Sequence, residues 1–214
     1  MNKAKLILLG AGGHCKSCID VIEAEGKYQV RGILDAKEKI GGQVCNYPII
    51  GTDEDIANLV KEGYSFLICI GQIKNANIRK SLYSHLTNLK ATIATIISPF
   101  AIVSKHATIG EGTIIMHHVV LNAGASIGVN AILNTGSIIE HDVQVGNHCH
   151  ISTHAVLNGS VIVGNEVFIG SGSVMSNNVN IASNVVIGAG SLVLKSINEK
   201  GTFVGHPLKN IHHG

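Results

Sequence analysis

His141 is the residue of this chain best placed, by its neighbours in the sequence, to act as a general base. Glu140 precedes it and Asp142 follows it. An imidazole has an unperturbed pKa of about 6.5, and a carboxylate that accepts a hydrogen bond from one ring nitrogen fixes the tautomer and raises the basicity of the other. We therefore interpret His141 and Asp142 as a candidate base and its acidic partner. The alternative is a solvated histidine at a surface corner.

A glycine-rich segment near the N-terminus is the second candidate site. Residues 10–13 read GAGG after a short apolar run, and helical spacing begins at His14. Backbone N–H groups at the start of a helix form a ready site for an anion. The fingerprint of a nicotinamide site is weak, because Cys15 replaces its third glycine. Gly12 and Gly13 are thus candidate anion-binding positions, and the alternative is a simple tight turn.

The elements that carry this loop alternate between strands and helices over residues 1–95. Short apolar runs predict strands, and longer runs with helical spacing predict helices. Such alternation favours an α/β domain with a small parallel sheet. Asp35 comes at the end of the second predicted strand, where a carboxylate is suited to bind a ribose or base edge. The strands are predicted at residues 5–9, 30–34 and 66–70, and the helices at 14–25, 52–61 and 75–86.

From Ile97 the period of the sequence changes to six. An aliphatic residue or methionine recurs at every sixth position as far as Val193, and the residue four positions later is small, β-branched or a cysteine. This pattern is typical of a parallel β-helix, in which each hexad gives a short strand and a turn and three hexads make a coil of eighteen residues. We expect this domain over residues 96–214, with residues eighteen apart stacked about 4.8 Å from one another.

Position in the hexad then predicts where individual residues point. His141 is third in its hexad, beside a corner, so its side chain is expected to face outward. The glycines of the repeat are expected where tight corners need permissive backbone dihedrals. They include Gly110, Gly146, Gly164 and Gly188.

Two other spacings do not predict a metal or redox centre. His118 and His154 share a column but lie two coils apart, about 9.6 Å, whereas zinc bonds to histidine are about 2.1 Å long. Cys15 and Cys18 have no second pair, and on a helix they are interpreted as packing residues. No metal is expected, and the five scattered cysteines are expected to be reduced thiols.

These motifs together resemble those of the left-handed β-helix acyltransferases, whose hexads have the form [LIV]-G-x-x-[STAV]-x. The order of the two domains is similar to that of the sugar acetyltransferases of the NeuD and PglD type, which act in bacterial sialic-acid-like and bacillosamine-like sugar pathways. The resemblance covers nearly the whole chain. It rests on residues 9–14, Asp35, residues 70–71, 134–135, 139–142 and 150–152, and the tail at 201–207.

The resemblance implies a fold, a donor and a role for each candidate residue. It implies a small Rossmann-like nucleotide-sugar-binding domain, a left-handed β-helix, a homotrimer and acetyl-CoA as co-substrate. The base is His141 and the tuning acid is Asp142. In the relatives, the UDP part of a nucleotide sugar is held at positions that correspond here to Gly12, Gly13, His14, Asp35 and Gly71. Acetyl-CoA is contacted at the positions of His150, Ser171 and Ala189.

Two of these assignments leave alternatives open. His150 is implied to contact the thioester or pantetheine arm, and the alternative is a hydrogen-bonded structural histidine. Ala36 follows Asp35 where some relatives have a second acid, so the identity of the sugar or base is open.

Composition excludes other classes of partner. Lys and Arg number 16 against 14 Asp and Glu, a net charge of +2 without a basic block, so binding to nucleic acid has no electrostatic basis. No apolar run approaches the roughly 18 residues that cross a membrane, and no signal-peptide pattern is present. The chain is expected to be cytoplasmic.

The sequence thus predicts an acetyl-CoA-dependent N-acetyltransferase that acts on the amine of a UDP-4-amino-sugar by direct attack, with His141 as general base. Two alternatives stay open. One is an O-acetyltransferase of a sialic-acid-like sugar, and the other is a β-helix scaffold without catalytic activity.

Overall fold

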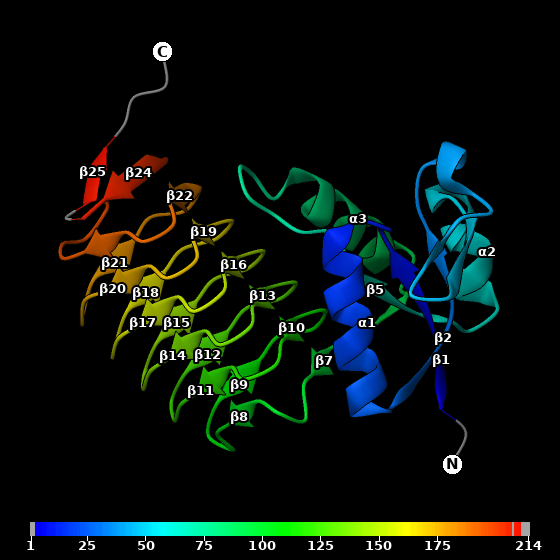
Figure 1. The fold of residues 1–214 in the computed structure, drawn as a ribbon, viewed down its shortest axis with the longest axis horizontal. Helices are drawn as coiled ribbons and strands as arrows, with labels where there is room; N and C mark the ends of the chain where they lie inside the picture. The colour runs from blue at the N-terminus through cyan, green and yellow to red at the C-terminus, as the bar shows by residue number, and fades with distance from the viewer. Residues whose placement is uncertain (1–2, 207, 211–214) are drawn as a thin grey trace. The chain divides into compact units, whose positions relative to one another are not determined.

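The chain folds into two compact units. The computed structural model describes residues 3–206 and 208–210. The first unit comprises Met1–Gly71 and Asn77–Pro99, and the second comprises Gln72–Ala76 and Phe100–Gly214 (Figure 1). The division after Pro99 falls close to the expected boundary at residue 95, but the short segment Gln72–Ala76 belongs to the second unit.

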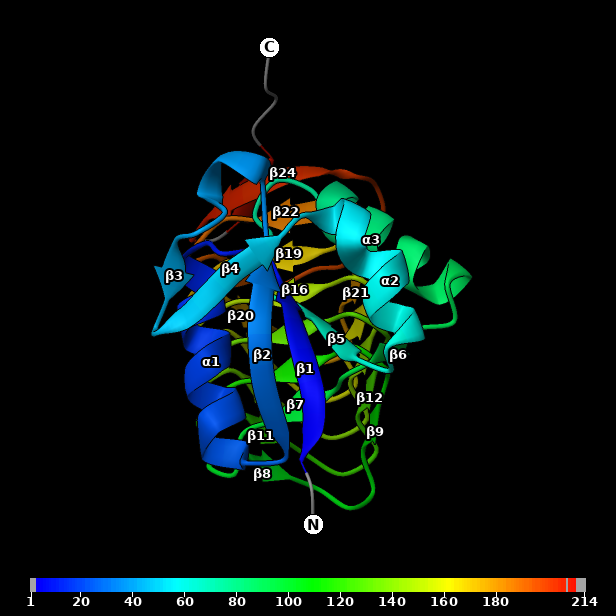
Figure 2. The same cartoon turned by 90° about the vertical axis from the view of Figure 1, so that its right-hand side faces the viewer.

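The first unit is a small sheet with helices on both sides. The strands are ordered β3-β4-β2-β1-β5-β6, and all neighbours are parallel except β3 and β4. Figure 2 shows α1 on one side of this sheet and α2 and α3 on the other. The elements are β1 Ala4–Leu9, α1 Gly13–Glu25, β2 Tyr28–Leu34, β3 Gln43–Val44, β4 Tyr47–Gly51, α2 Ile56–Lys61, β5 Ser65–Ile68, α3 Asn77–Asn88 and β6 Thr92–Ile93.

Apolar strands form the core of this unit because both faces of the sheet are covered. The last four residues of β1 and all of β5 are buried. One face packs against α2 and α3 through a cluster that includes Ile7, Phe66 and Leu82. The helix expected at residues 52–61 opens with a 3₁₀ turn at Asp53–Asp55, which the Thr52 capping box starts, before α2 begins.

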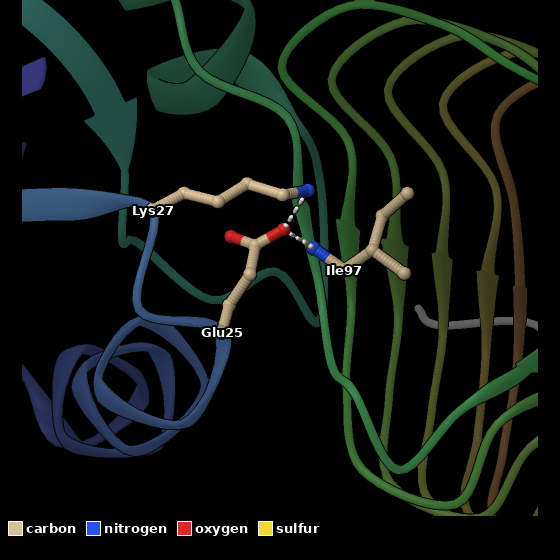
Figure 3. Close-up of polar contacts among 3 residues, drawn as sticks. All are labelled: Glu25, Lys27 and Ile97. Atoms are coloured by element: carbon tan, nitrogen blue, oxygen red, sulfur yellow. Dashed lines mark hydrogen bonds and ion pairs between the residues drawn. The ribbon is translucent and has the colours of Figure 1, made fainter. Parts of the chain in front are cut away.

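The end of α1 is tied to the strand that closes the first unit. The Glu25 carboxylate accepts a hydrogen bond from the backbone N–H of Ile97 at 3.3 Å and pairs with Lys27 at 2.6 Å (Figure 3). Ile97 belongs to β7, Ile96–Ile97, which opens the six-residue repeat. The buried Glu25 carboxylate therefore links the end of α1 to the residue at which the six-residue repeat begins.

The second unit is a parallel β-helix, as the hexads predict. From β8 to β23 each strand ends on the aliphatic residue or methionine that was expected to point inward. The strands are β8 Ile102–Val103, β9 Thr108–Ile109, β10 Ile114–Ile115, β11 Val120–Leu121, β12 Ser126–Ile127, β13 Ile132–Leu133, β14 Ile138–Ile139, β15 Gln144–Val145, β16 His150–Ile151, β17 Val156–Leu157, β18 Ile162–Val163, β19 Phe168–Ile169, β20 Val174–Met175, β21 Asn180–Ile181, β22 Val185–Ile187, β23 Leu192–Val193, β24 Gly201–Gly205 and β25 Leu208–Asn210.

These strands form three faces, which run from green to red in Figure 1. We call β10, β13, β16, β19, β22, β24 and β25 the tail face, β8, β11, β14, β17, β20 and β23 the apolar face, and β9, β12, β15, β18 and β21 the polar face. Partners in the pairs from β8 to β23 are eighteen residues apart, as in Ile138↔Val156, whereas β24 pairs with β22 at an offset of sixteen residues and with β25 in the antiparallel direction. The left hand of the helix stays an expectation, and Pro207 of the tail motif lies outside the described residues.

The corners use glycine differently from the expectation. Gly146 and Gly164 do not have positive φ values. The left-handed residues lie three positions after most of the inward aliphatic residues, as at Asp142, with φ 61°, and Gly124, with φ 77°. Gly146 is needed for another reason, because a Cβ there would lie 2.6 Å from the carbonyl oxygen of Gly164 in the next coil. These glycines allow close approach of neighbouring backbones.

Among the described residues, no helix combines the length and apolar character needed to cross a membrane.

Candidate active site

His141 and Asp142 form a hydrogen-bonded pair on the outer wall of the β-helix. They follow β14, at the corner between the apolar face and the polar face. The Nδ1 atom of His141 lies 2.9 Å from Oδ2 of Asp142, and the two side chains are 62% and 67% exposed. An ionised carboxylate only accepts hydrogen bonds, so Nδ1 is the donor and Nε2 carries the lone pair. The basic nitrogen therefore faces away from the acid that orients the ring.

The backbone of Asp142 turns its carboxylate toward the imidazole. Asp142 occupies a left-handed corner position, with φ 61°, and aspartate is among the residues that tolerate this conformation. Its Oδ1 atom lies over Gly124, one coil earlier, where a Cβ would collide with it. The corner conformation and the missing side chain together set the place of the acid.

A second glycine makes room for the imidazole. Gly159 lies one coil after His141, and a Cβ on it would come within 2.6 Å of both Cε1 and Nε2 of the His141 ring. The nitrogen with the lone pair therefore leans toward the coils that follow. Asn177, one coil further, brings its Nδ2 atom to 3.3 Å from the same point.

A neighbouring pair of side chains, Asn122 and Glu140, was not singled out from the sequence. The Asn122 amide donates to the Glu140 carboxylate at 2.8 Å, directly before His141. The two residues are eighteen apart, so the column rule of the β-helix is the signal that identifies them.

His150 is buried on the tail face, and both of its ring nitrogens have partners within the second unit. It is 6% exposed. Its Nδ1 lies 2.8 Å from the carbonyl oxygen of Gln72, and its Nε2 lies 3.2 Å from the Asn134 amide nitrogen. Since a carbonyl only accepts and an amide N–H donates, the ring is held in its neutral Nδ1–H form. The ring also packs edge-on against Phe168, with centroids 5.3 Å apart.

Ser171 and Ala189 are eighteen residues apart and lie at a different corner of the β-helix from His141. Both are exposed, at the corner between the tail face and the apolar face, and Ser171 Oγ is 2.9 Å from Ser152 Oγ. The corner of His141 lies at the other edge of the apolar face. In one chain the structure therefore places the expected base and the expected donor contacts on opposite edges of one sheet.

The glycine loop of the first unit, residues 10–13, is not covered by other atoms at Gly12 and Gly13. Gly12 caps α1 with ordinary extended dihedrals, φ −84° and ψ −172°, without a side-chain cap. A Cβ on Gly12 or Gly13 would meet nothing within 4 Å. The start of α1 is therefore uncovered beside Gly12 and Gly13, and a helix N-terminus is a favourable place for an anion.

Asp35 lies against this loop. Its carboxylate accepts hydrogen bonds from the backbone N–H groups of Ala11 at 2.5 Å and Ala36 at 2.6 Å, and Lys39 Nζ lies 3.0 Å from it. Burial raises the pKa of this carboxyl, but the hydrogen bonds from Ala36 and Ala11 and the Lys39 charge outweigh burial and lower it below 3.8. Asp35 is therefore ionised and ties β2 to the loop after β1.

Gly71 and His14 complete the cluster at the carboxyl ends of β1, β2 and β5. A Cβ on Gly71 would lie 3.7 Å from Cβ of His14. The structure thus brings together all five residues expected to bind the nucleotide. They gather where the strand order reverses beside β1, which is the usual place for a ligand in an open parallel sheet.

Beneath the loop lies a group of buried cysteines with a buried arginine. Cys15, Cys18 and Cys69 are free thiols. Burial raises the pKa of Cys18, yet a hydrogen bond from Cys69 and the charges of His14 and Arg79 bring it to about 6. Arg79 also donates to the carbonyl oxygen of Ile70 at 2.9 Å and so fixes the segment before Gly71. Sequence reasoning missed Arg79, because a charged residue on a helix is usually exposed.

Among the residues that the structure describes, no three His, Cys, Asp or Glu side chains gather in a way that suits a metal ion.

Comparisons with known proteins agree with this architecture. Residues 5–86 match the family model of the PglD N-terminal domain. The acetyltransferase domain of PglB from Neisseria gonorrhoeae superposes with a TM-score of 0.91 at 31% identity, over 98% of this chain and 100% of that one. PerB from Caulobacter crescentus, solved with CoA and GDP-perosamine, superposes with a TM-score of 0.90 at 30% identity, over 98% of each chain.

The match to PglB shows the class: a sugar acetyltransferase built on a β-helix. The chain belongs to the family of PglD-, PglB- and PerB-like sugar N-acetyltransferases. A protein named UDP-N-acetylbacillosamine N-acetyltransferase, from Bacillus subtilis, is 36% identical over 111 residues, which is 51% of this chain and 50% of that protein. The match thus spans about half of that relative's length.

We predict that Asp35→Asn removes a pH-dependent part of the stability. A carboxyl whose pKa is lowered in the folded state stabilises above its unfolded pKa, and the stabilisation is lost as pH falls through the folded pKa. The pKa of Asp35 lies below 3.8 in the folded protein. The urea midpoint of the variant should therefore be lower than that of wild type by its largest amount above about pH 5, and the two midpoints should become equal near pH 2. Asp20→Asn, at an exposed position of α1, is the control. A difference that does not change with pH would contradict the assignment.

We predict that Gly159→Ala moves the His141 ring. The added methyl cannot coexist with Cε1 and Nε2 at 2.6 Å, so the base is displaced and turnover should fall by about tenfold or more. Gly164→Ala is the matched control, because it also lacks a positive φ and its methyl would come within 2.6 Å of Ser183 N and 2.7 Å of Ser183 Oγ, at the corner between the polar face and the tail face. Stability is measured for both variants by thermal unfolding and turnover by thiol release. Equal turnover in the two variants would show that Gly159 has no part in placing the base.

Proposed function

We propose that this protein is an acetyl-CoA-dependent N-acetyltransferase that acetylates the amine of a UDP-4-amino-sugar, with His141 as general base. The observation that carries the proposal is the 2.9 Å contact between His141 Nδ1 and Asp142 on an exposed corner, which leaves Nε2 with its lone pair. An imidazole oriented by a carboxylate in this way is suited to take a proton from an attacking amine.

The reaction follows from this geometry. The amine attacks the thioester carbonyl while His141 Nε2 takes one of its protons. Asp142 stabilises the resulting imidazolium, as the acid does in other base–acid pairs. Collapse of the tetrahedral intermediate breaks the C–S bond, and the leaving thiolate of CoA takes the proton from the imidazolium. The products are the N-acetyl sugar and CoA, and no covalent intermediate with the protein is needed.

The first unit supplies the nucleotide site in this proposal. Gly12 and Gly13 at the start of α1 have open space where a side chain would stand, and the N–H groups of a helix N-terminus suit a diphosphate. Asp35, His14 and Gly71 border the same space. The choice of UDP is supported by the 36% identical relative, whose name specifies a UDP-sugar, whereas PerB was solved with GDP-perosamine.

The apolar face supports a homotrimer. Its outward residues form an unbroken aliphatic stripe at Ile102, Val120, Ile138, Val156, Val174 and Leu192. When this face is turned toward a three-fold axis, each edge of the face meets the opposite edge of the next copy. The corner of His141 in one copy then lies beside Ser171 and Ala189 of another, with His150 behind them. A trimer therefore unites the base and the donor contacts that a single chain keeps apart.

We predict that the purified protein releases thiol from acetyl-CoA only when a nucleotide-linked 4-amino-sugar is present. His141→Ala should lower kcat by about 10² to 10⁴, as loss of a general base does, without a change in melting temperature, because the side chain is exposed. The assay panel holds UDP- and GDP-linked 4-amino-sugars and free sialic acids, followed by thiol release and mass spectrometry of the product.

Three results would contradict the proposal. Turnover with sialic acids alone would assign the O-acetyltransferase alternative. The absence of turnover with every acceptor would favour a scaffold. Full activity of His141→Ala would show that His141 is not the general base. It would not contradict the fold or the assigned substrate. His106→Ala, at another exposed corner of the β-helix, controls for loss of a surface imidazole.

We also predict a solution mass three times the chain mass of 22.5 kDa. Ile138→Arg places a charge in the aliphatic stripe and should yield monomers with little activity, since unpaired charge is not tolerated in a buried interface. Gln144→Arg, on the polar face, is the matched control and should leave the trimer intact. Analytical ultracentrifugation measures both. A monomeric wild type that is fully active would contradict the shared site.

A further inference from the structure

One column of the second unit carries a lysine at each end and the expected base between them. Along the corner between the apolar and polar faces, positions eighteen apart hold Lys105, Ala123, His141, Gly159, Asn177 and Lys195. Lys195 is the middle residue of the last corner, between β23 and Ile197, which bridges to Ile181. It is exposed. Three coil spacings place it about 14 Å from His141 along the helix.

Positive charge is scarce in the β-helix. Residues 100–210 contain no arginine and four lysines, Lys105, Lys195, Lys200 and Lys209, against five acids, and of these lysines Lys105 and Lys195 share the column of His141. A donor that carries several phosphate charges needs a local cation, since phosphate binding rests on Lys, Arg or helix N-termini and the described part of the β-helix has no helix. The position of each lysine relative to the base is therefore informative.

The direction of the His141 ring shows which of the two lysines of the column lies on the side of its Nε2 atom. Nε2 lies on the side of Gly159, so the reacting carbonyl belongs on the side of the coils that follow, toward Lys195. The corners between Gly159 and Lys195 contain small or amide side chains, among them Ser160, Ser176 and Asn178. None of the residues from 158 to 160 or from 176 to 178 is acidic, so no carboxylate on these corners repels an anionic ligand.

The distance from the sulfur of CoA to its pyrophosphate also fits Lys195 better than Lys105. About thirteen bonds separate the sulfur of CoA from the nearer phosphorus of its pyrophosphate. That is the length of roughly four extended residues, about 14 Å. Lys105 lies only two coils from His141, about 9.6 Å, and on the side away from Nε2.

We propose that Lys195 binds the pyrophosphate of the acyl-CoA donor and thereby sets the donor's position along the corner that leads to His141. The proposal rests on the proposed acetyl-CoA-dependent function and adds a donor contact to it. The side chain acts through charge on a group distant from the reacting carbonyl, so it affects binding of the donor and not the chemical step.

The test compares Lys195→Gln with Lys105→Gln, a matched loss of charge in the same column. Lys195→Gln should raise the KM for acetyl-CoA about five- to tenfold with kcat unchanged, as expected for one exposed charge-assisted contact. Lys105→Gln should stay within twofold of wild type. With acetylpantetheine, which lacks every phosphate, Lys195→Gln and wild type should have the same kcat/KM. With acetyl-dephospho-CoA, which keeps the pyrophosphate, the increase in KM should persist.

Other outcomes overturn the proposal. Equal effects of the two variants, or an effect of Lys195→Gln that remains with acetylpantetheine, would show that Lys195 does not contact phosphate. An effect that disappears with acetyl-dephospho-CoA would exclude the pyrophosphate. Calorimetric binding of CoA to both variants gives a readout without turnover. If the wild type binds CoA but acetylates no acceptor, the proposed function is wrong. The CoA affinities of Lys195→Gln and Lys105→Gln, compared with that of wild type, would still test whether Lys195 binds phosphate.

Discussion

The stacking of successive coils at a fixed offset of eighteen residues is the constraint on which the second unit depends. It places every side chain beside neighbours that are set by position in the sequence, as Ile138 beside Val156. It also requires a left-handed residue at most corners, and at one of them that residue is Asp142. The turn that closes the coil is thus the same turn that brings a carboxylate onto His141. Asp142 therefore has two roles, because it forms the corner of the coil and orients the His141 ring.

Most of the fold followed from periodicity. The hexads predicted the last residue of every strand from Ile97 to Val193, because in a β-helix the period of the sequence is the period of the structure. The role of the glycines was predicted wrongly. Gly146 serves close approach of backbones rather than a left-handed turn, and the two demands are hard to separate in a sequence because glycine satisfies both.

The candidate site was only partly predictable. The outward direction of His141 follows from its place in the hexad, whereas the burial of His150 depends on Gln72, which lies 78 residues away in the chain. Arg79 beneath the glycine loop is equally a product of tertiary packing. Local spacing fixes what a corner presents to solvent. It carries no information about a segment that returns from elsewhere to cover a face or fill a core.

The claim most open to direct measurement is that the corner holds His141 with its proton on Nδ1 and its lone pair on Nε2. Long-range proton–nitrogen correlation spectra of ¹⁵N-histidine-labelled protein report the tautomer of each neutral ring, and the His141→Asn variant assigns the signal. We expect the neutral His141 ring of the wild type to carry a proton on Nδ1 and none on Nε2. A ring that carries its proton on Nε2 would contradict it.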